Sequence, residues 1–326
     1  MTELATGLGM LGGEEIADIL ESEPREMASV SPELWRTLRD LHTGGAFRQE
    51  FEAAWQNGRA FLRANDALRG RVPSLVEWKG AIRAPGDEVV PADLRIDHVY
   101  LVSCKYLSKI VLNASPSHVF DRLLAGGHGQ RGSDWYRTVA PVELQSLYTA
   151  ARDHVGMGRP ADVELLTGEQ RRDLSRALAR RWPPELVAEA RVFARVVAER
   201  SADRWREALD RSASAERLLW RLLRIGSAPY FVLGTDRAAS LRLRIQTPWD
   251  WRQAYRLEAF DIDTQASDQP VVSWRATIEA RRSGVRQDLL GHVEVRWSHG
   301  KFNGPPEAKV YLDTPHHRVP GYVPLH

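Results

Sequence analysis

The hydrophobic residues of this chain change their spacing part-way along the sequence, and that change limits the folds available to it. Beyond Gly226, apolar and polar residues alternate in several stretches between Tyr230 and Ser298. Successive side chains of a strand point to opposite faces, so this period of two is typical of strands with one buried and one wet face. In the clearest stretch one face carries Val272, Trp274, Ala276 and Ile278, and the other carries Ser273, Arg275, Thr277 and Glu279. We therefore expect mostly antiparallel strands here.

Before Gly226 the spacing is mainly helical, with a short β segment inside it. Apolar residues such as Phe47, Phe51 and Phe61 recur at helical intervals between residues 14 and 67. Residues 75–79, 89–96 and 99–107 instead have the composition and alternation of strands. We expect an α/β (α+β) fold: a mixed sheet flanked by helices in residues 1–226, with its core at about residues 70–125. An antiparallel β region that binds substrate is expected in residues 227–326.

Composition restricts the environment and the partners of the chain. Of its 326 residues, 45 are Lys or Arg and 43 are Asp or Glu, a net charge of +2 that gives no global attraction to nucleic acid. The one cysteine, Cys104, excludes an intrachain disulfide and fits a reducing cytoplasm. The first residues lack the pattern of a signal peptide, and no stretch approaches about 18 uncharged apolar residues. We expect a cytoplasmic protein with no membrane partner.

The segment Pro91–Lys105 is the part of the sequence most suggestive of chemistry. An acidic strand leads through a turn near Asp97 into an apolar strand that ends Ser103-Cys104-Lys105. A lysine on an apolar strand is costly to bury without an anionic partner or ligand. A three-residue loop at Asp97–Val99 would place Asp93 opposite Ser103, on the face that carries Lys105, whereas a two-residue turn would place Asp93 on the other face.

These residues resemble the PD-(D/E)XK nuclease superfamily, in which an Asp on one strand and an acid-x-Lys on the next bind Mg²⁺ and position water against a phosphodiester. The resemblance covers residues 77–105 and implies that Asp93 or Asp97 binds the metal and that Lys105 orients or activates the water. Ser103 stands where the superfamily has its second acid, so Glu77 is the candidate replacement. The expected cofactor is Mg²⁺ or Mn²⁺, both of which favour carboxylate oxygen ligands.

Two alternatives stay open for this segment. Glu77-Trp78-Lys79 is itself an acid-x-Lys on an expected strand, and it would need an Asp from elsewhere. Asp93 and Lys105 could also form a buried structural ion pair, because short motifs match by chance.

Basic and aromatic residues elsewhere could contact DNA. Lys109 follows the lysine strand, and Arg296, His299 and Lys301 lie in a stretch that also contains Trp297 and Phe302. Such a mixture suits stacking on bases and contacts to phosphate, and it also suits a wet sheet face.

The sequence therefore predicts a metal-dependent endonuclease that cleaves DNA phosphodiester bonds in restriction, repair or defence. One alternative is a non-catalytic nucleic-acid-binding or complex-assembly protein on a decayed nuclease core, which the missing acid at Ser103 favours. Another is an interaction protein without a nucleic-acid role, which the small net charge favours. The sequence leaves open whether the substrate is DNA or RNA and whether the protein is a homodimer.

Overall fold

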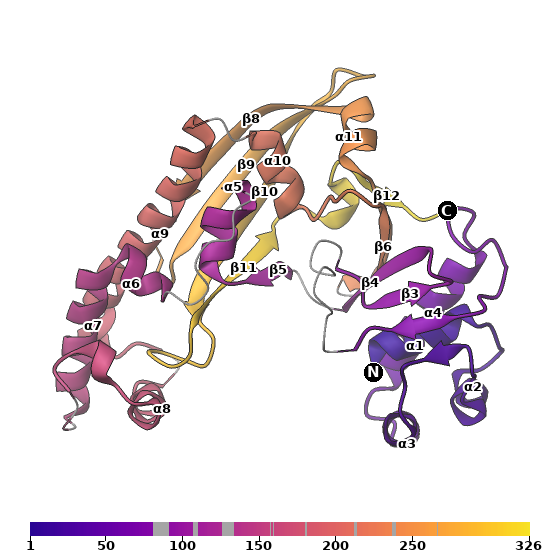
Figure 1. Ribbon diagram of the computed structural model, residues 1–326, viewed down its shortest axis with the longest axis horizontal. Helices are drawn as coiled ribbons and strands as arrows, with labels where there is room; N and C mark the ends of the chain where they lie inside the picture. The colour runs from indigo at the N-terminus through magenta and orange to yellow at the C-terminus, as the bar shows by residue number, and fades with distance from the viewer. Residues whose placement is uncertain are drawn as a thin grey trace. The chain divides into compact units, whose positions relative to one another are not determined.

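A computed structural model describes residues 1–80, 91–106, 110–125, 134–156, 158, 160–179, 181–211, 214–236, 239–265 and 267–326. The chain divides into two compact units. Unit 1 comprises Met1–Lys109, Arg224–Tyr255 and Pro315–His326, and unit 2 comprises Ile110–Leu223 and Arg256–Thr314. This division differs from a single boundary near Gly226, because the chain leaves unit 1 after its first four strands, returns at Arg224, and leaves and returns once more (Figure 1).

Unit 1 is built around a mixed seven-stranded sheet in the order β1-β2-β3-β4-β6-β7-β12. β2, β3 and β4 form an antiparallel meander, β4 pairs in parallel with β6, and β6, β7 and β12 are antiparallel neighbours. The short strand β1 pairs in parallel with β2 at one edge. The strands are β1 (Met27–Ala28), β2 (Val76–Trp78), β3 (Leu94–Ile96), β4 (Tyr100–Tyr106), β6 (Tyr230–Asp236), β7 (Ala239–Ile245) and β12 (Tyr322–Pro324).

Helices α1 (Thr2–Met10) and α4 (Arg48–Arg63) pack against one face of this sheet, as Figure 1 shows. Their side chains join Val76, Leu94 and Val102 in one hydrophobic core. The two helices touch through glycines: a Cβ on Gly58 would lie 2.0 Å from the carbonyl oxygen of Thr6. The remaining helices of unit 1 are α2 (Ile16–Ser22), α3 (Pro32–Thr43), α11 (Pro248–Ala254) and the 3₁₀ turn η4 (His316–Arg318).

Unit 2 contains an antiparallel five-stranded sheet in the order β5-β11-β10-β9-β8. Its strands are β5 (Ile110–Ala114), β8 (Tyr255–Thr264), β9 (Val271–Ala280), β10 (Arg286–Trp297) and β11 (Pro306–Leu312). The predicted two-faced strand is confirmed at β9, where Val272, Trp274, Ala276 and Ile278 are at most 2% exposed. Gly291 on β10 faces Trp274, and a Cβ there would lie 2.2 Å from the indole ring. The sheet thus buries one face around that tryptophan.

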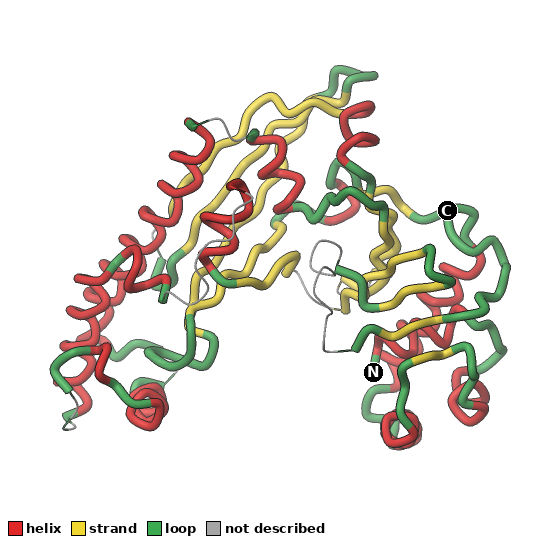
Figure 2. Tube along the Cα trace, viewed as in Figure 1, coloured by secondary structure: helices red, strands yellow, loops and turns green. Residues whose placement is uncertain are grey.

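Helices cover the buried face of this second sheet, and the long helix α9 runs beside it (Figure 2). Trp205 of α9 is fully buried and donates from its indole nitrogen to the carbonyl oxygen of Val119 at 2.9 Å. The helical elements are η1 (His118–Arg122), α5 (Leu123–Ala125), α6 (Trp135–Val139), α7 (Pro141–Val155), η2 (Val163–Leu165), α8 (Gly168–Ala177), η3 (Pro184–Leu186), α9 (Val187–Asp210) and α10 (Ala215–Leu222).

The expected fold class is confirmed: the chain is a mixed α+β protein with a mixed sheet and an antiparallel sheet. At the start of α8, the side chain of Thr167 forms a capping box with Gln170. Of the expected strand 89–96, residues 94–96 form β3, and the part before residue 91 lies outside the described residues.

Candidate functional site

The turn between β3 and β4 fixes which residues share a face of the unit 1 sheet. Ile96 pairs with Tyr100, so the connection is the three-residue loop Asp97–Val99. Asp97 and His98 both adopt left-handed backbone conformations, with φ of 47° and 58°. Asp and His are among the non-glycine residues that tolerate this region best. The three-residue alternative is therefore confirmed, and the pairing of β3 with β4 runs from Ile96–Tyr100 to Leu94–Val102, with Asp93 just before β3.

Asp93 contacts the lysine strand directly. Its Oδ2 accepts hydrogen bonds from Ser103 Oγ at 3.2 Å and from the backbone nitrogen of Cys104 at 2.6 Å. Its own backbone nitrogen donates to the carbonyl oxygen of Val102 at 2.8 Å. Ser103 is 1% exposed, and Lys105 follows two residues later on the same face. The structure thus joins Asp93 to Ser103, and Lys105 lies two residues further along β4.

Strand β2 brings a second lysine to Asp93. Trp78 pairs with Leu94, and the backbone nitrogen of Lys79 donates to the carbonyl oxygen of Asp93 at 2.9 Å. The backbones of Lys79 and Asp93 are therefore neighbours just beyond the paired ends of β2 and β3. The two acid-x-Lys alternatives share this one aspartate. This arrangement could not be predicted from the residue pattern, which indicates the β3–β4 hairpin but not the longer-range pairing of β2 with β3.

Glu77 is held by an arginine that the sequence analysis did not single out. Arg95 pairs with Glu77 across β2 and β3 and donates from Nε and one Nη at 2.5 and 2.7 Å. His98 Nδ1 lies 3.2 Å from the same carboxylate. The hydrogen bonds from Arg95 lower the pKa of Glu77 against the opposing effect of burial, and the charges of Arg95, His98 and Lys79 add to the lowering. Glu77 is therefore a carboxylate at neutral pH, already paired.

The carboxylate of Asp97 forms its hydrogen bonds with the segment just before β2. It accepts from Arg71 Nη1 at 2.6 Å, from the backbone nitrogen and hydroxyl of Ser74 at 2.8 and 2.9 Å, and from the backbone nitrogen of Leu75 at 3.0 Å. Burial raises the pKa of Asp97, but these hydrogen bonds outweigh it and leave the pKa below its ordinary value. Of the two aspartates that competed for the metal-binding role, the geometry favours Asp93.

Asp93 and Glu77 are the carboxylates on this face that a hard divalent ion would use. Mg²⁺ is often held by one or two carboxylates, with water and substrate phosphate completing its shell. The donor type therefore fits, although Glu77 would have to release Arg95. Within the described ranges, no cluster of three or more His, Cys, Asp or Glu side chains is placed to hold a metal ion. The site thus offers two carboxylates at most from these residues.

Of the four residues expected to contact DNA, the structure describes three. Lys109 lies outside the described residues. Arg296, His299 and Lys301 all lie in unit 2, on β10 and the loop after it. Arg296 Nε donates to Glu307 at 3.0 Å, and His299 Nδ1 lies 2.7 Å from Ser298 Oγ.

Lys301 has a different environment from a surface lysine. It is 8% exposed, and its ammonium donates to the carbonyl oxygens of Leu178 and Ala179 at 3.2 and 2.9 Å, just beyond the end of α8. Burial lowers its pKa to about 8. These contacts are those of a cation that closes a helix C-terminus, where free carbonyl groups favour positive charge.

Comparisons with models of known protein families, with curated proteins and with solved structures give no match to this chain. The similarity of residues 77–105 to PD-(D/E)XK nucleases therefore stays a hypothesis that rests on the residues and their register. Among the helices that the structure describes, none has the length and apolar character needed to cross a membrane.

Proposed function

We propose that the protein is a metal-dependent endonuclease that cleaves DNA phosphodiester bonds on the β2–β3–β4 face of unit 1. The observation that supports this proposal most is the set of hydrogen bonds that joins Asp93 to Ser103 and Cys104 on β4 and to the backbone of Lys79, just after β2. Asp93 would supply a ligand for a cation, and Lys79 and Lys105, on the neighbouring segments, would supply a partner for the phosphate or the attacking water. A cytoplasmic role in restriction, repair or defence belongs to the same proposal.

Each residue of this face has a chemical role in the proposal. Asp93 and Glu77 would hold Mg²⁺ or Mn²⁺, which lowers the pKa of bound water and offsets charge on the phosphate. Ser103 Oγ and the backbone nitrogen of Cys104 fix the Asp93 carboxylate by hydrogen bonds. Lys105 would orient the attacking water, and Lys79 would contact a phosphate oxygen from the neighbouring strand.

The test is cleavage of plasmid, single-stranded and modified DNA with Mg²⁺ or Mn²⁺, by wild type and by Lys105→Ala. Loss of cleavage in Lys105→Ala, with thermal stability retained, supports the proposal, because the substitution removes the charge near Asp93. Arg36→Ala is the matched control: it removes a cation that is 66% exposed on α3 of the same unit, and cleavage should persist. Equal cleavage by Lys105→Ala and wild type would contradict the lysine assignment.

The second candidate is a nucleic-acid-binding protein without catalysis on the same face. The observation that favours it is the bidentate pairing of Glu77 with Arg95, which occupies the second carboxylate. Calorimetric titration with Mn²⁺ separates the two functions, because the nuclease requires an ion at Asp93. Binding to wild type that Asp93→Asn abolishes favours the nuclease. Salt-sensitive DNA binding without Mn²⁺ binding favours the second candidate.

A further inference from the structure

Unit 2 contains a pocket where three connections meet at one end of its sheet. These are the α8–α9 connection, the loop between β8 and β9, and the turn after β10. The pocket has a volume of about 560 Å³, within the range of small-molecule sites. Arg181, Trp182, Phe193, Arg296, Trp297 and Lys301 are among its lining residues.

Aromatic rings form one wall of the pocket. Trp182 and Trp297 approach edge to face, with ring centroids 6.4 Å apart and an interplanar angle of 65°. Phe193 of α9 stacks on Trp297 at 5.6 Å and 15°. Both tryptophans retain partial exposure, whereas Phe193 is 2% exposed. The wall is therefore backed by the core and presents indole surface to the pocket.

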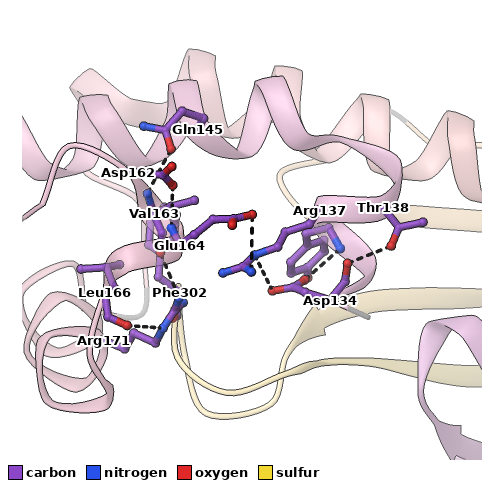
Figure 3. A network of polar contacts seen from close by, with 11 residues as sticks. Asp134, Arg137, Thr138, Gln145, Asp162, Val163, Glu164, Leu166, Arg171 and Phe302 are labelled. Carbon is purple, nitrogen blue, oxygen red and sulfur yellow. Dashed lines mark hydrogen bonds and ion pairs between the residues drawn. The ribbon is translucent and has the colours of Figure 1, made fainter. Parts of the chain in front are cut away.

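The turn after β10 closes the pocket. It is anchored at two residues, Lys301 and Phe302. Lys301 is fixed by the carbonyl groups after α8, and its ammonium lies 4.3 Å from the centre of the Trp182 ring. Arg171 Nη1 donates to the carbonyl oxygen of Phe302 at 3.1 Å (Figure 3). The same guanidinium donates to the carbonyl oxygens of Leu166 and Val163 at 3.3 and 2.9 Å. These contacts fix the pocket before any ligand binds, which lowers the entropic cost of binding.

Positive charge gathers at the same place. Arg181, Arg296 and Lys301 line the pocket, and Arg181 is exposed. Asp268 also lines it, but its carboxylate is neutralised by Arg191 at 2.7 Å. Arg296 donates to Glu307 at 3.0 Å, which leaves Arg181 as the cation best placed to meet a charged ligand at the rim. Aromatic rings with cations at the rim suit a ligand that is flat and apolar at one end and anionic at the other.

We propose that this pocket binds one nucleotide unit, with the base against Trp182 and Trp297 and the phosphate at Arg181. Stacking on aromatic side chains is available to every base and is combined with basic residues in proteins that hold single strands. The unit could belong to a DNA strand or be a free nucleotide, since the recognised chemistry is shared. This inference deepens the proposed function, on which it rests for the nature of the ligand, but binding at this pocket needs no cleavage.

The experiment measures binding in EDTA, so that no metal-dependent cleavage occurs. Quenching of tryptophan fluorescence is followed on titration with deoxycytidine monophosphate, with single-stranded DNA of ~12 nucleotides and with its duplex, a length chosen to span one binding groove. We expect Trp182→Ala to weaken the binding of nucleotide or single strand about tenfold, the loss typical of one stacked base. Arg181→Glu should weaken it by a similar factor of about ten, because it reverses the charge that meets the phosphate. Arg195→Glu, which changes an exposed arginine of α9, should bind like wild type.

The outcomes separate this inference from the proposed function. Weaker binding by Arg181→Glu, an exposed residue whose substitution leaves the aromatic wall intact, supports the pocket even if wild type cleaves no DNA. If the free nucleotide binds and competes with the single strand, a free nucleotide is sufficient to fill the pocket. If only the strand binds, the pocket recognises a nucleotide that is part of a DNA chain. The inference is overturned if wild type binds none of the three probes, or if Arg181→Glu and Trp182→Ala bind as tightly as wild type.

Discussion

Two aspartates four residues apart have different roles because the backbone places them differently. Asp93 lies beside β4, where Ser103 and Cys104 donate to its carboxylate. Asp97 lies in the loop, where Arg71, Ser74 and Leu75 donate to it. Both are acids in a short segment of sequence, so the residue pattern alone did not show which of them would bind the metal ion. The register of one hairpin separates a candidate ligand from a structural residue.

Asp97→Ala should destabilise the protein by about 1–3 kcal/mol, the usual cost of leaving donors near a removed charged acceptor unsatisfied. Thermal or urea denaturation measures this loss, with Asp40→Ala on the exposed side of α3 as a control that should change little. Since the folded pKa of Asp97 is lowered, its stabilisation is present above the unfolded pKa and is lost as the pH falls through the folded pKa. A wild-type advantage that grows on acidification would contradict this.

His292 should stabilise unit 2 most at low pH. Its Nδ1 lies 2.8 Å from Asp313, and the hydrogen bonds with Asp313 and Glu294 raise its pKa to about 9. A raised folded pKa gives stability that is complete below the unfolded pKa of about 6.5 and disappears as the pH rises through about 9. We expect His292→Gln to cost about 1–2 kcal/mol at low pH, after allowance for solvent screening, and almost nothing above the folded pKa. An NMR titration of His292 near its ordinary pKa would refute the pairing.

At the scale of elements, patterns among neighbouring residues were sufficient to predict a strand. Contacts between segments far apart in the sequence could not be predicted. Alternation identified β9 and its buried face, because the pattern depends on residues that are neighbours in the sequence. The pairing of β2 with β3, which brings Lys79 to Asp93, joins segments separated by a loop and has no local signature. For the same reason, the Glu77–Arg95 pair and the capping of α8 by Lys301 could not be predicted.

The contact between α1 and α4 depends on the absence of side chains. A Cβ on Gly58 would lie 2.0 Å from the carbonyl oxygen of Thr6 and 2.9 Å from the Cα of Gly9. Gly58→Ala should therefore force the helices apart and cost about 1–3 kcal/mol or more, despite the better helix propensity of alanine. Urea denaturation measures the loss. Gly158→Ala, where the structure has no atom within 4 Å of the added Cβ, should be neutral. Equal stability of the two variants would refute the close contact.

At the scale of the whole molecule, the two units are interleaved along the chain. Unit 1 takes segments from the start, the middle and the end, and unit 2 takes the two segments between them. The change of period near Gly226 lies close to the return of the chain at Arg224, but period alone does not show which sheet a strand joins. β6 and β7 belong to the sheet that carries Asp93, whereas β8 to β11 form the other sheet with β5. The candidate nuclease face and the nucleotide pocket therefore belong to different units.

We propose that Asp93, not Asp97, is the aspartate that binds the metal ion. Asp93→Asn and Asp97→Asn both keep the shape of the side chain, so DNA cleavage by the two variants can be compared with Mg²⁺ or Mn²⁺ at a temperature where both remain folded. We expect Asp93→Asn to lose cleavage and Asp97→Asn to retain it. Cleavage that survives in Asp93→Asn and disappears in a folded Asp97→Asn would contradict the proposal.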